Sequence, residues 1–205
     1  LITTNDMQGG SEEQDAFVMN PNFPPKIMGG SAYYKYVKSI ENELPDLDKN
    51  LLILDGGNFF QGHPLGIADS GRTMINWMNQ IKYDAMVPGQ HDFLFGYKNL
   101  LNLSSLAKFP FIASNIKYLT NDEYVFNPYT IVEIDDVKIG VIGIASSNME
   151  NLVLSKNIQG IYFSDEVAAL NEWIPKVKEL GADIVILLSS LGIPWDREKV
   201  YADFL

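Results

Sequence analysis

Polar side chains that can bind metals or phosphates follow four apolar segments of the chain, in loops at residues 4–9, 55–62, 89–93 and 188–192. Each loop comes where a predicted strand ends, and the carboxyl ends of strands are where α/β proteins bind their ligands. Carboxylate, imidazole and amide groups in such loops are typical ligands of divalent metals. In an active metal hydrolase a carboxylate is expected at position 58, but the residue there is Asn58.

Strands and helices alternate along the first half of the chain, and they must position these loops. The sequence predicts strands at residues 1–4, 51–54, 83–87 and 111–114, and helices at residues 29–43, 73–81 and 97–107. The segment at residues 11–28, with its three prolines, is predicted to hold no regular element. This order favours helices packed on a sheet.

The second half of the chain changes the pattern. Strands at residues 129–134 and 137–144 are separated only by Asp135 and Asp136, which predicts a hairpin and therefore a mixed sheet. Ser164 is the predicted N-cap of a helix that runs to about residue 180, and a strand at 183–188 and a helix from about Asp196 follow. The predicted fold class is α/β, a layered sandwich of mixed β-sheet with helices on its outer faces, in one domain over residues 1–205.

The composition excludes several classes of function. The formal net charge of −11 repels phosphate backbones, so a nucleic-acid polymer is not an expected partner. The chain has no cysteine, which excludes disulfides and thiolate metal sites. No stretch reaches the ~18 apolar residues of a transmembrane segment.

The four loops contain Thr-Asn-Asp-Met-Gln-Gly, Asp-Gly-Gly-Asn-Phe-Phe-Gln-Gly, Gly-Gln-His-Asp and Ser-Ser-Leu-Gly, beginning at residues 4, 55, 89 and 189. These sequences resemble T-N-D-x-H-G, D-x-G-D-x-x-Q-G, G-N-H-E and S-H-L-G, the patterns of the metallophosphatase domain in the 5′-nucleotidase / UDP-sugar hydrolase family of calcineurin-like phosphoesterases. The resemblance covers essentially the whole chain, in order. It implies a metallophosphoesterase-like fold.

The resemblance also implies two-metal hydrolysis of phosphate esters, with Mn, Zn or Fe as the metals. Carried over position by position, the family's metal ligands fall on Asp6, Gln8, Asn58, Gln90 and Ser190. Asp6 keeps the family's residue. The other four replace a histidine, the aspartate that bridges both metals, an asparagine and a second histidine, in that order. An amide brings no charge to offset cation repulsion, and losing even an outer partner of a metal costs ~10–100-fold in affinity.

The predicted catalytic residues are His91 and Asp92. The resemblance assigns His91 to stabilising charge on the phosphate and the leaving group, and Asp92 keeps the acid beside it. Substrate-binding residues are not predicted. The family's last metal loop, a G-H-x-H pattern, and its aromatic-lined substrate domain are expected beyond residue 205. The resemblance implies a periplasmic or extracellular location.

The substitutions favour a first hypothesis: a non-catalytic domain, or pseudoenzyme, that serves as a binding or scaffold module. It needs no cofactor and works with a protein partner or a completing chain. In this hypothesis Asn58, Gln90 and Ser190 form a hydrogen-bonded polar cluster in the former metal cavity. Asp6 and Asp55 are then carboxylates that cap loop N–H groups.

Two other hypotheses stay open. The first is a metal-dependent phosphoester or nucleotide hydrolase with an altered or partner-completed site, which uses Asp6, His91 and His63. The second is a metal-free binder of nucleotides or sugar phosphates. It would use the N–H groups of the glycine pairs at residues 9–10 and 56–57.

Overall fold

The structure is a computed structural model that describes residues 1–10, 12–17, 19–43 and 51–192. Its strands are β1 (Ile2–Thr4), β2 (Gln14–Asp15), β3 (Lys26–Ile27), β4 (Ile53–Asp55), β5 (Ala85–Met86), β6 (Ile116–Tyr118), β7 (Tyr129–Ile134), β8 (Val137–Ile144), β9 (Ile161–Phe163) and β10 (Ile184–Ser189). Its helices are α1 (Gly30–Glu43), α2 (Pro64–Ile67), α3 (Arg72–Ile81), α4 (Tyr97–Leu106), α5 (Met149–Leu152) and α6 (Glu166–Glu179), with short 3-10 helices η2 (Gln90–Phe93) and η3 (Ser155–Asn157).

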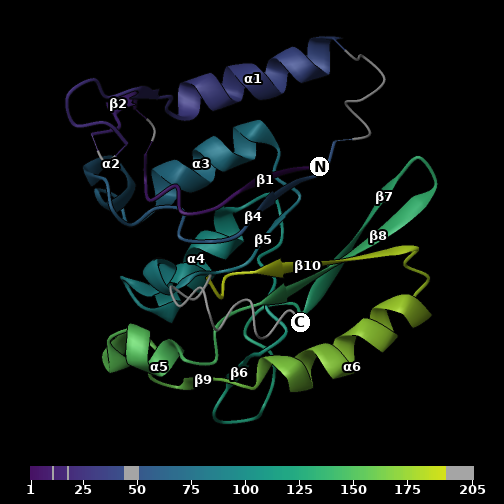
Figure 1. Cartoon of the computed structure of the whole chain (residues 1–205). Coiled ribbons are helices and arrows are strands. Elements are labelled where there is room, and N and C mark those ends of the chain that lie inside the picture. Colours follow the sequence, from purple (N-terminus) through teal and green to yellow (C-terminus); the bar gives the residue numbers. More distant parts are fainter. Residues whose placement is uncertain (11, 18, 44–50, 193–205) are drawn as a thin grey trace.

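Two three-stranded sheets form the centre of the fold (Figure 1). One has the strand order β1-β4-β5 and is parallel; the other has the order β10-β8-β7, in which β10 pairs with β8 in parallel and β7 pairs with β8 antiparallel. Figure 1 shows α1 and α3 on one side of the sheets and α6 on the other. The predicted α/β class with a mixed sheet and helices on its outer faces is confirmed.

Apolar side chains join the two sheets. Leu54 from β4, Ala85 from β5, Val141 from β8 and Leu188 from β10 belong to one buried cluster. A second, larger cluster packs α3 and α4 against the other face of the β1-β4-β5 sheet, and it includes Phe59, which follows β4. Both clusters fix the ends of the strands, so the loops that leave β1, β4, β5 and β10 start from rigid positions.

Two predictions about local structure are wrong. Residues 111–114 form no continuous strand, because Phe111 bridges to Met86 whereas Ile112 bridges to Asn127 on a different segment. The N-cap of α6 is Asp165 rather than Ser164, since the Asp165 carboxylate accepts the N–H of Ala168 at 2.8 Å.

Other predictions need smaller changes. The segment at residues 11–28, expected to hold no regular element, contains the two-residue strands β2 and β3, which pair antiparallel. The helix predicted from about Asp196 lies outside the described residues. Within the described part of the chain, every helix is too short or too polar to cross a bilayer.

Candidate functional site

Backbone hydrogen bonds join the loop after β1 to the loop after β4. The N–H groups of Asp6, Gln8 and Gly9 donate to the carbonyl oxygens of Gly57, Asn58 and Phe59, each at 2.9 Å. Three residues of these loops other than glycine have positive φ: 52° for Asp6, 49° for Gln8 and 61° for Asn58. Asn and Asp tolerate this conformation better than most residues. The paired loops place the Asp6 and Asn58 side chains against each other.

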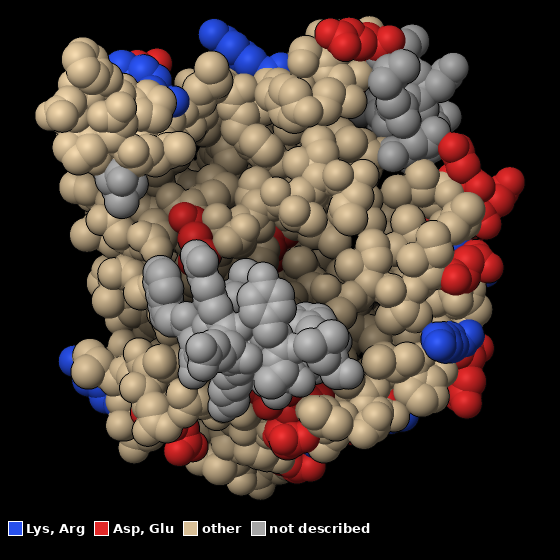
Figure 2. Space-filling model, in the orientation of Figure 1, with Lys and Arg blue, Asp and Glu red and all other residues tan. Residues whose placement is uncertain are grey.

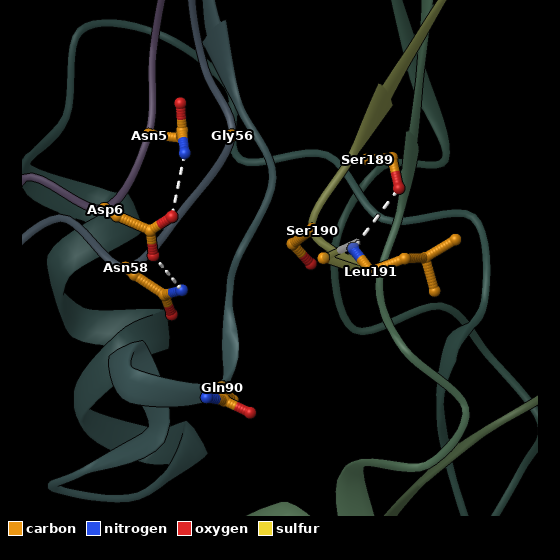
Figure 3. Close-up of a pocket in the computed structure, with 9 residues that line it drawn as sticks. Asn5, Asp6, Gly56, Asn58, Gln90, Ser189, Ser190 and Leu191 are labelled. Atoms are coloured by element: carbon orange, nitrogen blue, oxygen red, sulfur yellow. Dashed lines mark hydrogen bonds between the residues drawn. The ribbon is translucent and has the colours of Figure 1, made fainter. Parts of the chain in front are cut away.

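The side-chain amide of Asn58 contacts the Asp6 carboxylate (Figure 3) and the backbone of His91. Its Nδ2 donates to Asp6 Oδ1 at 2.7 Å, and its Oδ1 accepts the backbone N–H of His91 at 2.9 Å. On the other side of the carboxylate, Asn5 Nδ2 donates to Asp6 Oδ2 at 2.7 Å. Both oxygens of Asp6 therefore accept hydrogen bonds from amide groups.

Four of the five predicted metal-ligand positions line one cavity of about 430 Å³: Asp6, Asn58, Gln90 and Ser190. Asp6 and Asn58 lie on one wall and Ser190 on the opposite wall, with Gln90 between them at one end of the close-up (Figure 3). Ser190 Oγ donates to the carbonyl oxygen of Pro88 at 2.8 Å, so its hydroxyl hydrogen is already used.

Gln8 faces a different cavity. It lies with His63 and Asp6 around a hollow of about 520 Å³ that also contacts Ile27 and Met28. His63 caps α2, since its Nδ1 accepts the N–H of Leu65 at 3.3 Å, and its own N–H donates to Gln8 O at 2.7 Å. His63 thus caps a helix beside the site.

His91 lines a third and smaller cavity, of about 130 Å³, together with Gln90. The His91 Nε2 and Gln90 Nε2 atoms are 3.3 Å apart. Since Asp6 borders the first two cavities and Gln90 borders the first and third, the three cavities adjoin along the predicted metal-ligand positions and His91.

Asp92 is fully buried and lines none of these cavities. Its Oδ2 accepts the N–H groups of Asn58 at 2.7 Å and Gly89 at 2.9 Å, and its Oδ1 accepts that of Phe59 at 2.9 Å. Burial raises the pKa of Asp92 to about 7, against the opposite effect of the three N–H donors. A side chain without exposed surface touches no substrate, so we interpret Asp92 as a residue that ties the loops after β4 and β5 together.

Asp55 is the second fully buried carboxylate at this edge. It accepts the N–H of Gly57 at 2.9 Å and the hydroxyl of Thr4 at 2.5 Å, and the Thr4 hydroxyl also lies 2.9 Å from the hydroxyl of Tyr83. Burial raises the pKa of Asp55 to about 7. Its hydrogen bonds match the expected capping of loop N–H groups.

The described residues do not fit the pair of divalent ions that the resemblance implies. The first cavity carries one carboxylate, Asp6, beside amides and hydroxyls, and among the described residues no three His, Asp or Glu side chains are grouped as metal ligands. The two ions of such a pair lie close together and need anionic ligands to offset their repulsion. A set of oxygen donors with one carboxylate suits a single hard cation such as Mn²⁺ or Mg²⁺.

The glycine N–H groups proposed for phosphate binding are not available. The N–H groups of Gly9 and Gly10 donate to Phe59 O and Met7 O, at 2.9 and 2.7 Å. Those of Gly56 and Gly57 donate to Thr4 O at 2.7 Å and to Asp55 Oδ1 at 2.9 Å. The hypothesis of a metal-free phosphate binder that uses these groups is therefore wrong.

Among the described residues, no Lys or Arg lines the three cavities. Figure 2 shows a hollow in the middle of this face with acidic atoms on its wall, while the Lys and Arg side chains in view lie at the periphery. A phosphate ester would need a bound cation to find a positive partner here.

Sequence reasoning missed Asn5. The residue stands inside a quoted loop pattern, and its position beside Asp6 is the signal that it could contact the same carboxylate. Its role becomes visible only from the 2.7 Å hydrogen bond, because a neighbour in sequence can point to either side of a loop.

Known proteins with similar sequence or structure support the resemblance to calcineurin-like phosphoesterases. The family model for calcineurin-like phosphoesterases matches residues 3–205. Human 5′-nucleotidase is 29% identical over 203 residues, which is 96% of this chain and 34% of that protein. The trifunctional nucleotide phosphoesterase YfkN of Bacillus subtilis is 36% identical over 166 residues, or 70% of this chain and 11% of that protein.

A solved structure extends the match to the fold. The 5′-nucleotidase precursor of Thermus thermophilus superposes with a TM-score of 0.78 at 22% identity, over 93% of this chain and 36% of that one. The chain spans about a third of the human and Thermus relatives and a smaller share of YfkN. By the family match over nearly its whole length, this chain belongs to the calcineurin-like phosphoesterase family, as a nucleotidase-like metallophosphatase domain.

Proposed function

We propose that this chain hydrolyses phosphate esters of the nucleotide class with an altered, metal-dependent site. The relatives support hydrolysis better than the non-catalytic hypothesis, because those compared above are named as nucleotidases or as a nucleotide phosphoesterase. The observation that carries the proposal is that the Asn58 amide joins the metal ligand and the catalytic histidine of the resemblance: it donates to the Asp6 carboxylate and accepts the backbone N–H of His91. We include residues 1–205 as one domain in this proposal.

Hydrolysis by this site requires a cation, for reasons of charge. The cavities have no basic lining side chain among the described residues, and the glycine N–H groups are used inside the protein. Asp6 and the oxygens of Gln90 and Ser190 would hold a hard cation, of which Mn²⁺ is the one shared with the family's metals. When bound, the cation supplies positive charge for the phosphate. His91 would bind or protonate the ester from the third cavity.

The hydrogen bond between Asn58 and Asp6 favours a second candidate, a non-catalytic domain that acts as a binding or scaffold module. An amide in the bridging position, held by two hydrogen bonds, satisfies the carboxylate without a metal. In this case a protein partner or a completing chain carries the function. A periplasmic or extracellular location belongs to both candidates as a proposal from the resemblance.

Hydrolysis of adenosine monophosphate and of p-nitrophenyl phosphate, measured with Mn²⁺, with Mg²⁺ and with EDTA, separates the two candidates. The hydrolase predicts cation-dependent turnover that falls by about 100-fold or more in Asp6→Ala and in His91→Ala. No turnover above the rate of Asp6→Ala under any of these conditions would refute hydrolysis and leave the binding module.

A further inference from the structure

The altered site has a built-in substitute for a bound cation. We propose that Asn5 and Asn58 hold the Asp6 carboxylate in place of a metal, so that this edge of the fold is stable without metal and binds cations weakly. Asn58 is the positioning residue that sets this property. The inference concerns the site of the proposed function, but its readouts are stability and cation affinity, which do not depend on turnover.

Two hydrogen bonds fix the orientation of the Asn58 amide. Its Nδ2 faces Asp6 Oδ1 at 2.7 Å and its Oδ1 faces the backbone N–H of His91 at 2.9 Å. Turning the amide over would bring its oxygen against the carboxylate and its NH₂ against an N–H group, so both contacts would become repulsive. The NH₂ group therefore points at the carboxylate.

Asn5 supplies the second amide donor, to the other carboxylate oxygen of Asp6. Its Nδ2 donates to Asp6 Oδ2 at 2.7 Å, so each carboxylate oxygen has an amide donor. A cation that binds Asp6 at either of these positions must displace a hydrogen bond or bring an N–H group close to a positive charge. This lowers the affinity of the site for any cation relative to a site with acceptors only.

The backbone keeps the two side chains together whether or not a cation is bound. The three hydrogen bonds from residues 6, 8 and 9 to residues 57, 58 and 59 involve no side chain. Replacing Asn58 by Asp would change only the group that faces Asp6, since a carboxylate oxygen can still accept the N–H of His91. Two carboxylates would then meet at the present 2.7 Å contact.

The test compares thermal unfolding midpoints in EDTA and in Mn²⁺, with the Mn²⁺ dissociation constant measured by calorimetry. We expect the wild-type midpoint to be the same in EDTA and in dilute Mn²⁺. Asn58→Asp should unfold about 4–12 °C lower in EDTA because of carboxylate repulsion. Mn²⁺ should restore its midpoint and bind at least ~10-fold more tightly than to the wild type.

A double variant separates this mechanism from simple intolerance of a carboxylate at position 58. In Asp6→Asn with Asn58→Asp, the donor and acceptor exchange places, and the amide introduced at position 6 could donate to the new carboxylate while accepting from Asn5. This variant should regain most of the lost stability in EDTA, without added Mn²⁺. If Asn58→Asp does not fold in EDTA, Asn5→Asp provides a second test, because it should also lower the unfolding midpoint in EDTA and regain it in Mn²⁺. Asn102→Asp, on the exposed face of α4, controls for the added charge.

Three results would overturn the inference. The first is a wild-type midpoint that falls in EDTA or rises by several degrees in dilute Mn²⁺. The second is an Asn58→Asp variant as stable as the wild type in EDTA. The third is a double variant no more stable than Asn58→Asp. Absence of hydrolysis in all variants would refute the proposed function while these stability results still decide the inference.

Discussion

The buried carboxylate of Asp92 gives the sharpest stability prediction. Replacing Asp92 by Asn keeps the shape of the side chain but turns one acceptor oxygen into an NH₂ group. Both oxygens now accept backbone N–H groups, two on Oδ2 and one on Oδ1. In either orientation the NH₂ group of the new amide therefore faces at least one backbone N–H group. The better orientation is the one in which the NH₂ group faces only the N–H of Phe59.

The magnitude follows from the contacts. The better orientation loses the hydrogen bond to Phe59, about 1 kcal/mol, and leaves a buried backbone N–H and the new NH₂ unsatisfied, at about 1–3 kcal/mol for each group. We expect Asp92→Asn to lower the free energy of unfolding by about 3–7 kcal/mol. Urea denaturation followed by circular dichroism measures this difference directly.

Asp55→Asn is the matched control, because Asp55 is also fully buried. Its Oδ1 accepts Gly57 N–H, but its other oxygen faces the Thr4 hydroxyl, which can turn to donate to Tyr83 and accept from the new amide. We expect this variant to lose less than about 1 kcal/mol. Equal losses in the two variants, or a loss under about 1 kcal/mol in Asp92→Asn, would refute this account of the loops.

Two further predictions concern pH and packing. The folded protein keeps protons on Asp55 and Asp92 up to about pH 7, whereas unfolded carboxyls lose them near 3.8. The stability from these protonated groups is therefore greatest below pH 3.8 and is lost as pH rises through about 7, and Asp55→Asn should flatten the unfolding free energy measured across that range. A Cβ at Gly89 would lie 2.2 Å from Asn58 Oδ1, so Gly89→Ala should cost about 1–3 kcal/mol and disturb the site. Gly181→Ala, with open space but a φ of +90°, should cost only the backbone strain of about 1–2 kcal/mol, and a chemical denaturation series that gives the reverse order would contradict the packing argument.

The fold was largely readable from the sequence. Apolar runs bounded by turn residues predicted β1, β4, β8 and β10 to within one or two residues, since each run is short and has the length of a strand. The failure at Phe111 and Ile112 has a physical cause. The segment is apolar and buried like a strand, but it pairs with two different neighbours, and pairing is not visible in one sequence.

The site was predicted less completely. The loop patterns brought Asp6, Asn58, Gln90 and Ser190 to one cavity, because strand ends meet at one edge of a sheet. The patterns could not show that Gln8 faces a separate cavity or that Asp92 has no exposed surface. Gln8 lies in a loop with positive φ and Asp92 in a short 3-10 helix, and in neither place does periodicity predict the side-chain direction.

The backbone hydrogen bonds between the loops after β1 and β4 fix the positions of the residues there without using their side chains. Because the N–H and carbonyl groups of residues 6–9 and 57–59 hold the loops, side chains at the ligand positions can be exchanged with little effect on the path of the chain. Such a frame makes the ligand positions on these two loops suitable for protein engineering. At Gln8 and Asn58 a new side chain can be introduced on a backbone that is held by its own hydrogen bonds, at the cost in stability expected for a variant such as Asn58→Asp.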